Sequence, residues 1–263
     1  MYRKPIDERK TTMSQLLFVF IILLGCETKL EKSSLVERND ILYPINSETP
    51  FTGVVTENGN KIGNYKDGKK EGLFIWFHTN GQKKEQTTYS NGKKDGLSTI
   101  WYENGQMEKE IEYKQGIEDG SFGLWFQNGQ KKEQTTYSNG KKDGLSTIWY
   151  ESGQMEKEIE YKQGLEDGRI TFWFENGNKA AEGSYRNGKE HGTNSYWYKN
   201  GNKKKEANIR NGIQQGLTKI WFEDGQIQLE GTFKDGKMHG KLKQWNSQGK
   251  LIMNLTYVNG TEQ

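Results

Sequence analysis

Three histidines, His78, His191 and His239, are the residues best suited to bind a metal or to transfer a proton near neutral pH. The last two occupy equivalent places in two Gly-Lys-x-His-Gly segments that lie 48 residues apart. If four strands spaced about 4.8 Å apart separate them, the distance is roughly 19 Å. Two ligands of one zinc ion must lie within a few ångströms of each other, so these histidines cannot share a metal. We therefore expect no metal site and no catalysis by histidine.

Carboxylates recur as Glu118-Asp119, Glu166-Asp167, Asp95 and Asp143. A glycosidase needs two carboxyl groups roughly 5–10 Å apart in a cleft. The aspartates in this set stand before glycine, however, where an aspartate side chain commonly caps the local backbone of a turn. We favour the turn interpretation and predict no catalytic residue, no cofactor and no small-molecule substrate.

Paired lysines also recur along the chain. They could form a basic stripe for an anionic lipid or a polyanionic glycan. Interleaved glutamates such as Glu85, Glu108 and Glu110 favour instead an ordinary solvated sheet face that resists edge aggregation. The pairs are Lys69-Lys70, Lys83-Lys84, Lys93-Lys94, Lys131-Lys132, Lys141-Lys142 and Lys203 to Lys205.

The elements that carry these residues repeat with a period of 24 residues. Seven tryptophans follow the period: Trp101, Trp125, Trp149, Trp173, Trp197, Trp221 and Trp245. A second row begins Tyr65, Tyr89, Tyr113, Tyr137, Tyr161 and Tyr185 and continues with Ile209, Phe233 and Tyr257. Fixed periods of this length indicate a repeat architecture. Residues 80–120 match residues 128–168 at all but two positions, which favours a scaffold built by duplication over one precise active site.

Each unit has the pattern of a β-hairpin. Asn-Gly and Asp-Gly dipeptides, such as Asn91-Gly92 and Asp95-Gly96, accept the positive φ angles of hairpin turns. Between them, the segment 107–113 alternates, with Met107, Ile111 and Tyr113 on one side, and period two indicates a strand. The sequence therefore predicts an all-β fold: an elongated single-layer antiparallel ribbon of about eight hairpin units (full units 65–256), roughly 75–80 Å long.

Two sets of aromatic residues are candidates for the core or for a binding surface. We expect the seven tryptophans to form a structural aromatic ladder. The residue that follows each tryptophan should face the opposite side of a regular strand, which makes that set the candidate binding face. Its members are Tyr102, Phe126, Tyr150, Phe174, Tyr198 and Phe222.

The pattern Y-x-N-G-K-x-x-G-x-x-x-x-W-Y-x-N-G-Q, which runs from Tyr89 to Gln106, resembles the MORN repeat variant. The resemblance covers residues 51–260 and includes the variant found in bacterial YwqK-family antitoxins. It implies a fold of stacked hairpins that mediates protein or membrane association without catalysis. An antitoxin role is the alternative that the resemblance raises.

The N-terminal segment has the pattern of an export signal. Residues 16–24 are nine consecutive apolar residues, too short for a spanning helix but the length of a signal h-region, and Arg3 and Lys4 lie in a basic segment upstream. The segment 23–26, Leu-Leu-Gly-Cys, resembles the lipobox of bacterial lipoproteins and contains the only cysteine of the chain. The resemblance implies cleavage between Gly25 and Cys26 and lipidation of Cys26. Two or more acyl chains then give stable membrane anchoring.

Charge argues against a nucleic-acid partner. The formal net charge is +3, and removal of the leader takes away four basic and two acidic residues, which leaves +1. Binding to nucleic acid needs clustered basic charge. We therefore predict a signal peptide and signal helix over 1–25, a lipidated tether over 26–50 and a repeat array over 51–263. The expected protein is an exported, membrane-anchored, non-catalytic scaffold of the bacterial envelope with a protein, lipid or glycan partner.

Overall fold

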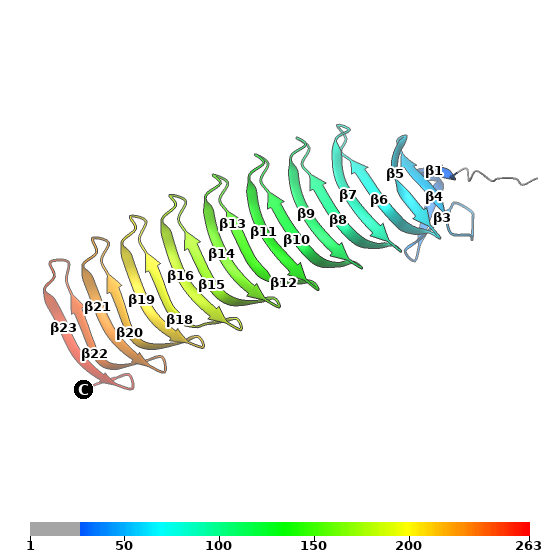
Figure 1. The fold of residues 1–263 in the computed structure, drawn as a ribbon. Coiled ribbons are helices and arrows are strands. Elements are labelled where there is room, and N and C mark those ends of the chain that lie inside the picture. The colour runs from blue at the N-terminus through cyan, green and yellow to red at the C-terminus, as the bar shows by residue number, and fades with distance from the viewer. Residues whose placement is uncertain (1–26) are drawn as a thin grey trace, which may run out of the picture.

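A computed structural model describes residues 27–263 and shows one sheet of 22 strands with a separate two-stranded hairpin near its N-terminal end (Figure 1). The predicted signal helix and Cys26 lie outside the described residues. The N-terminal elements are β1 (Lys29–Glu31), the 3-10 turn η1 (Lys32–Ser34), β2 (Leu35–Arg38), β3 (Ile41–Pro44), β4 (Gly53–Glu57) and β5 (Asn60–Lys66).

The repeat strands follow in chain order. They are β6 (Lys69–Phe77), β7 (Lys83–Ser90), β8 (Lys93–Trp101), β9 (Met107–Lys114), β10 (Ile117–Trp125), β11 (Lys131–Ser138), β12 (Lys141–Lys142), β13 (Gly144–Trp149), β14 (Met155–Lys162), β15 (Leu165–Trp173), β16 (Lys179–Arg186), β17 (Lys189–Glu190), β18 (Gly192–Trp197), β19 (Lys203–Arg210), β20 (Ile213–Trp221), β21 (Ile227–Lys234), β22 (Lys237–Trp245), β23 (Leu251–Val258) and β24 (Thr261–Glu262). From β4 onward each long strand pairs antiparallel with the next, and β1 pairs parallel with β4. The predicted all-β hairpin ribbon is confirmed.

The two edges of the ribbon use different turns, although both contain Asn-Gly. At one edge Asn91 and Gly92 both have positive φ, 52° and 82°, which is the geometry of a two-residue hairpin turn. At the other edge Asn104 has an ordinary φ and uses its side chain. Its Oδ1 accepts from the Gln106 N–H and its Nδ2 donates to the Gln127 carbonyl of the next unit, both at 3.0 Å. One dipeptide therefore serves two kinds of turn.

Bulges decide which side chains share a face. The register pairs Trp101 with Met107 but Ile100 with Lys109, so Glu108 is an extra residue. Met107 therefore lies on the same face as Trp101 and opposite to Ile111, and the prediction that placed Met107 with Ile111 is wrong. We call the face with the seven tryptophans the Trp face and the face with the tyrosine row the Tyr face.

A second bulge lies in the middle of each unit, where the predicted Asp95-Gly96 turn was wrong. Both residues lie inside β8, and Gly96 has φ 108°. The register slips at the matching place in β10, between Glu118 and Phe122. The glycine accommodates a backbone conformation that other residues rarely adopt.

The Tyr face carries a row of buried side chains along the centre of the sheet. Thr87, Ser98 and Ile111 are at most 2% exposed, and register pairs them in that order across β7, β8 and β9. Thr87 and Ser98 also share a hydrogen bond of 2.6 Å. The row continues through Phe122, Thr135, Ser146, Ile159, Ile170, Asn194, Ala207, Thr218 and Leu242, all of which are buried.

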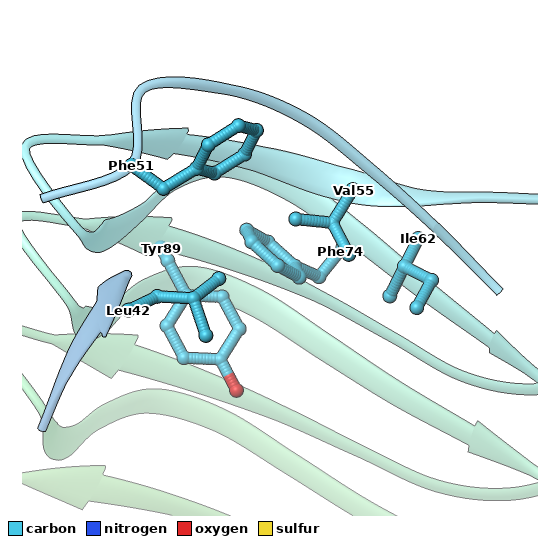
Figure 2. Packing of buried hydrophobic residues seen from close by; sticks show 6 residues of the cluster. All are labelled: Leu42, Phe51, Val55, Ile62, Phe74 and Tyr89. Atoms are coloured by element: carbon cyan, nitrogen blue, oxygen red, sulfur yellow. The ribbon is translucent and has the colours of Figure 1, made fainter. Parts of the chain in front are cut away.

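The N-terminal end has a hydrophobic cluster of its own (Figure 2). Phe74 is fully buried and contacts the ring of Tyr89, with the centroids 5.2 Å apart. Val55 and Ile62 complete the cluster from β4 and β5, while Leu42 of β3 joins from outside the sheet. This cluster closes one end of a sheet that otherwise has a single layer, as terminal units of repeat proteins must.

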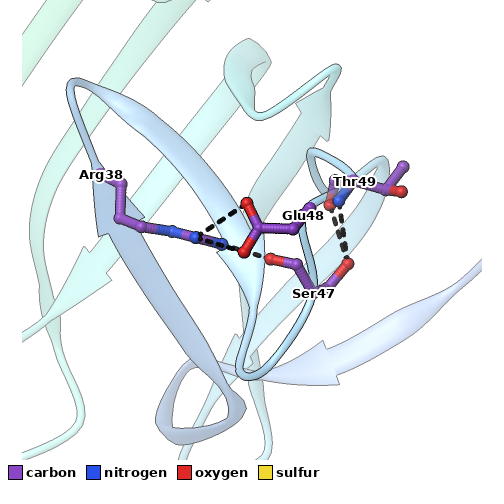
Figure 3. A network of polar contacts seen from close by, with 4 residues as sticks. All are labelled: Arg38, Ser47, Glu48 and Thr49. Atoms are coloured by element: carbon purple, nitrogen blue, oxygen red, sulfur yellow. Dashed lines mark hydrogen bonds and ion pairs between the residues drawn. The ribbon is translucent and has the colours of Figure 1, made fainter.

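The predicted tether over 26–50 is wrong for residues 29–44, which form three short strands and a 3-10 turn and contribute Leu42 to the cluster. The loop after β3 is also held in place. Arg38 donates to Glu48 at 3.1 Å and to the Ser47 carbonyl, while the Ser47 hydroxyl accepts from the Thr49 N–H at 3.0 Å (Figure 3). The aperiodic sequence of this segment concealed a cap.

Candidate functional site: the Trp face and the edges of the ribbon

One row of the Trp face alternates tryptophan with methionine, lysine, isoleucine or leucine. The register places Met107 opposite Trp101 and Lys131 opposite Trp125. Every one of the seven tryptophans is half-buried, since a single-layer sheet has no second layer to cover it. The other pairs in this row are Trp149 with Met155, Trp173 with Lys179, Trp197 with Lys203, Trp221 with Ile227 and Trp245 with Leu251.

The Trp face also exposes aliphatic side chains. Leu97, Leu145 and Leu217 are 41%, 48% and 43% exposed, and each lies four residues before a tryptophan on the same strand face. Contiguous exposed apolar surface commonly marks an interaction site. The Trp face is therefore the more accessible apolar surface of the repeat array.

The candidate binding face lies at the turn edge and not within the strands. Tyr102 follows the last residue of β8 and begins the turn, so the expected alternation does not apply to it. Its hydroxyl donates to the carbonyl of Trp125 in the next unit, at 2.8 Å. Tyr150 and Tyr198 make the same link to Trp173 and Trp221. The rings of Tyr102, Phe126, Tyr150, Phe174, Tyr198 and Phe222 are all half-buried, and their role in binding stays a prediction.

Lysines and glutamates neutralise each other on the Tyr face. Lys94 lies 3.6 Å from Glu85, and Lys142 lies 2.6 Å from Glu133. Consecutive lysines also divide between the faces, since alternate residues of a strand point to opposite sides. The Lys94 ammonium lies 5.0 Å from the centre of the Tyr113 ring. Burial raises the pKa of the Tyr113 phenol, with smaller contributions from Glu118 and Glu85.

The carboxylates singled out in the sequence connect units instead of facing one another. Asp143 Oδ2 accepts from the Gln163 N–H at 3.1 Å, and Asp167 Oδ2 accepts from the Asn187 N–H at 3.1 Å. Asp95 accepts from the side chain of Gln115 at 2.7 Å. They cap the turn of the following unit, 20 residues along the chain.

Two of the three histidines occupy unit-linking positions as well, whereas His191 Nδ1 is buried without a hydrogen-bond partner in the described part of the chain. His78 Nε2 lies 2.8 Å from the Trp101 carbonyl, in the position that Tyr102 takes one unit later. His239 Nδ1 accepts from the Asn259 N–H at 3.4 Å. Within residues 27–263 no group of three His, Cys, Asp or Glu side chains is arranged to hold a metal. The same part of the chain contains no helix with the length and apolarity needed to cross a bilayer.

Sequence inspection missed the glutamates of the Trp face as a row. Glu110 pairs with Gly123 and Glu158 pairs with Thr171 in the register. Glu182 and Glu206, one and two units after Glu158, also follow the 24-residue period, which was the available signal.

No curated protein matches the chain. Among solved structures, alternansucrase in complex with isomaltononaose is similar at 19% identity, with a TM-score of 0.21, over 82% of this chain and 16% of that protein. The chain thus spans 16% of that protein's length, and a TM-score so low supports no argument.

The MORN repeat variant matches six segments of 22 residues that together span half of the chain: residues 70–91, 94–115, 142–163, 166–187, 190–211 and 214–235. Each segment begins near the start of one long strand and ends in the two-residue turn of the next hairpin. The chain belongs to the MORN repeat variant family.

Proposed function

We propose that this protein is an exported bacterial lipoprotein, anchored through Cys26, whose repeat ribbon is a non-catalytic scaffold for a protein partner at the membrane surface. The observation that carries the scaffold part is the continuous 22-stranded sheet, which has the half-exposed tryptophan row along one face. Repeat arrays of this kind present long surfaces suited to binding. Family membership supports a scaffold in the same way.

The anchor part rests on the sequence. The apolar segment 16–24 and the single cysteine at position 26 have the arrangement of a lipoprotein signal. The described structure begins at residue 27, and β1 starts at Lys29, so the ribbon would lie close to the acylated residue. This arrangement holds the scaffold near the bilayer without a spanning segment.

The anchor is tested by fractionation of a bacterial host that expresses the full chain. Wild type should incorporate labelled fatty acid and sediment with membranes, whereas Cys26→Ser should lose the label and the membrane retention. Thr28→Ser, which leaves the cysteine in place, is the matched control. A wild-type protein that is unlabelled and found in the soluble fraction would refute the anchor.

The scaffold is tested by crosslinking the full chain in envelope extracts, followed by mass spectrometry. The proposal is supported by a protein that is crosslinked in stoichiometric amount and that also binds the purified ribbon. Recovery of no protein, or turnover of an envelope component by the purified ribbon, would contradict it.

A further inference from the structure

Four tryptophans of the Trp face already hold a cation. The Lys83 ammonium lies 5.7 Å from the centre of the Trp101 ring and donates to Gln86 Oε1 at 2.9 Å. A cation over an indole ring is attracted by the negative face of the ring. The same arrangement is found for Lys131 over Trp149, Lys179 over Trp197 and Lys203 over Trp221.

The other three tryptophans, Trp125, Trp173 and Trp245, have no lysine at the position of Lys83, and in the unit of Trp245 the equivalent glutamate, Glu230, is paired with Lys219. For Trp125 the residues that correspond to Lys83 and Gln86 are Met107 and Glu110. For Trp173 they are Met155 and Glu158. Among the described residues, no lysine or arginine lies over either of these two rings. In these two units a methionine therefore stands in place of the lysine, and the glutamate has no lysine of its own unit beside it.

The two glutamates also differ from their later counterparts. Glu182 pairs with Lys179, Glu206 pairs with Lys203, and Glu230 lies 3.3 Å from Lys219. Within residues 27–263, Glu110 and Glu158 have no cationic partner within 4.0 Å. Their charge remains available to a group from another molecule.

The surface is hollowed at Trp125. Gly123 lies opposite Glu110, and the Trp125 ring leans over the space that a side chain at Gly123 would fill. The ring thus occupies that space, and beside it lies a cavity of about 140 Å³ whose lining includes Glu110, Ser121, Trp125, Lys131 and Gln134. Lys131, the register partner of Trp125, also borders this cavity, while its ammonium lies 6.0 Å from the centre of the Trp149 ring in the next unit. Trp125 and Glu110 are both half-buried and border this cavity together.

We propose that Trp125 with Glu110 and Trp173 with Glu158 bind two cationic side chains of an extended basic segment in a partner protein. The inference rests on the proposed scaffold function and names the chemistry of its partner. Two units separate the sites, so four strand spacings place them about 19 Å apart. An extended chain rises about 3.3 Å per residue, so two arginines six residues apart reach both sites. Guanidinium is suited to both contacts, since it stacks on aromatic faces and pairs with carboxylates.

The test replaces the Met/Glu pair of a proposed site by the Lys/Gln pair found at Trp101, and measures the binding of a peptide. The probe is a Thr/Ser peptide with arginines at positions 1 and 7, compared by calorimetry with the same peptide carrying glutamines there. The variants Met107→Lys with Glu110→Gln, and Met155→Lys with Glu158→Gln, give each site the composition that Trp101 already has. They should fold, because the chain contains that combination elsewhere. Each should weaken binding of the arginine peptide about tenfold, the effect of losing one cation site.

The reverse exchange is the matched control. Lys131→Met with Gln134→Glu converts Trp149, midway between the two sites, into a third site. A peptide with arginines at positions 1, 3 and 7, which all point to the same side of an extended chain, should then bind about tenfold more tightly than to wild type.

The inference would be overturned if the glutamine peptide bound with the same affinity as the arginine peptide. It would also be overturned if none of the double variants changed the affinity of the arginine peptide. A crosslinked envelope protein whose capture is unaffected by the exchanges would leave the scaffold function standing and refute this site alone.

Discussion

The phenol hydroxyl of Tyr102 donates a hydrogen bond to the main-chain carbonyl of Trp125, and the two oxygen atoms lie 2.8 Å apart. The bond joins the turn of one unit to the last strand residue of the next. Tyr150 and Tyr198 repeat it, so part of the aromatic edge stabilises the stack of units whatever else it binds.

Removal of this hydroxyl should weaken the coupling between units. We expect Tyr102→Phe to lower the free energy of unfolding by about 1 kcal/mol, the net contribution of a neutral hydrogen bond. The ring itself should be tolerated, because Phe126 and Phe174 occupy equivalent positions. Urea denaturation followed by far-UV circular dichroism measures the change. An unchanged midpoint would show that water replaces the bond without cost.

The two turn types should respond differently to glycine. Asn91→Gly should be nearly neutral, since the left-handed conformation at this position is easy for glycine. Asn104→Gly removes the acceptor for Gln106 and the donor to Gln127, so we expect a loss of about 1–2 kcal/mol. Paired denaturation curves of the two variants check this. Equal losses would contradict the assignment of two turn types.

The N-terminal cluster should be the most sensitive to truncation. Phe74 is fully buried, and replacement of a buried phenylalanine by alanine costs about 3–5 kcal/mol. Each unit of a repeat array contacts only its neighbours. Phe74→Ala should therefore raise the hydrogen-exchange rates of β4 to β7 more than those of β20 to β23. Hydrogen-exchange mass spectrometry resolves the two regions. Uniform loosening along the ribbon would show that the cluster is not a local cap.

The same cluster, against which Tyr65 also packs, should lose stability in alkali. Burial raises the pKa of Tyr65 and of Tyr89 to about 12, with smaller contributions from nearby carboxylates. Ionisation in the unfolded chain begins near the usual value of about 10, so the folded state binds more protons between pH 10 and 12. The stability contributed by the two neutral phenols is therefore complete below pH 10 and is lost as pH rises to about 12.

The double variant Tyr65→Phe with Tyr89→Phe is the control for this pH dependence, because it keeps the rings and removes both titrating groups. The difference in urea midpoint between wild type and the double variant should shrink or reverse from pH 9.5 to pH 11.5. A constant difference over that range would rule out both tyrosines as the source.

Local signals determined the architecture. The 24-residue spacing of Trp101 and its equivalents, the turn dipeptides and the alternation near Ile111 each depend on residues close in sequence, so the hairpin ribbon was predictable. Whether Asn-Gly forms one turn or the other was not, because the Asn104 side chain bonds to Gln127, 23 residues away.

Tertiary structure alone decided which side chains share a surface. A bulge at Glu108 moves Met107 to the Trp face, and one extra residue is enough to reverse every assignment beyond it. The cap was equally hidden, since Leu42 joins Phe74 from a segment without periodicity. The environment of Trp125 depends on Glu110 and Gly123 meeting across two strands. Such contacts arise from packing between strands and units, and the sequence pattern within one strand does not predict them.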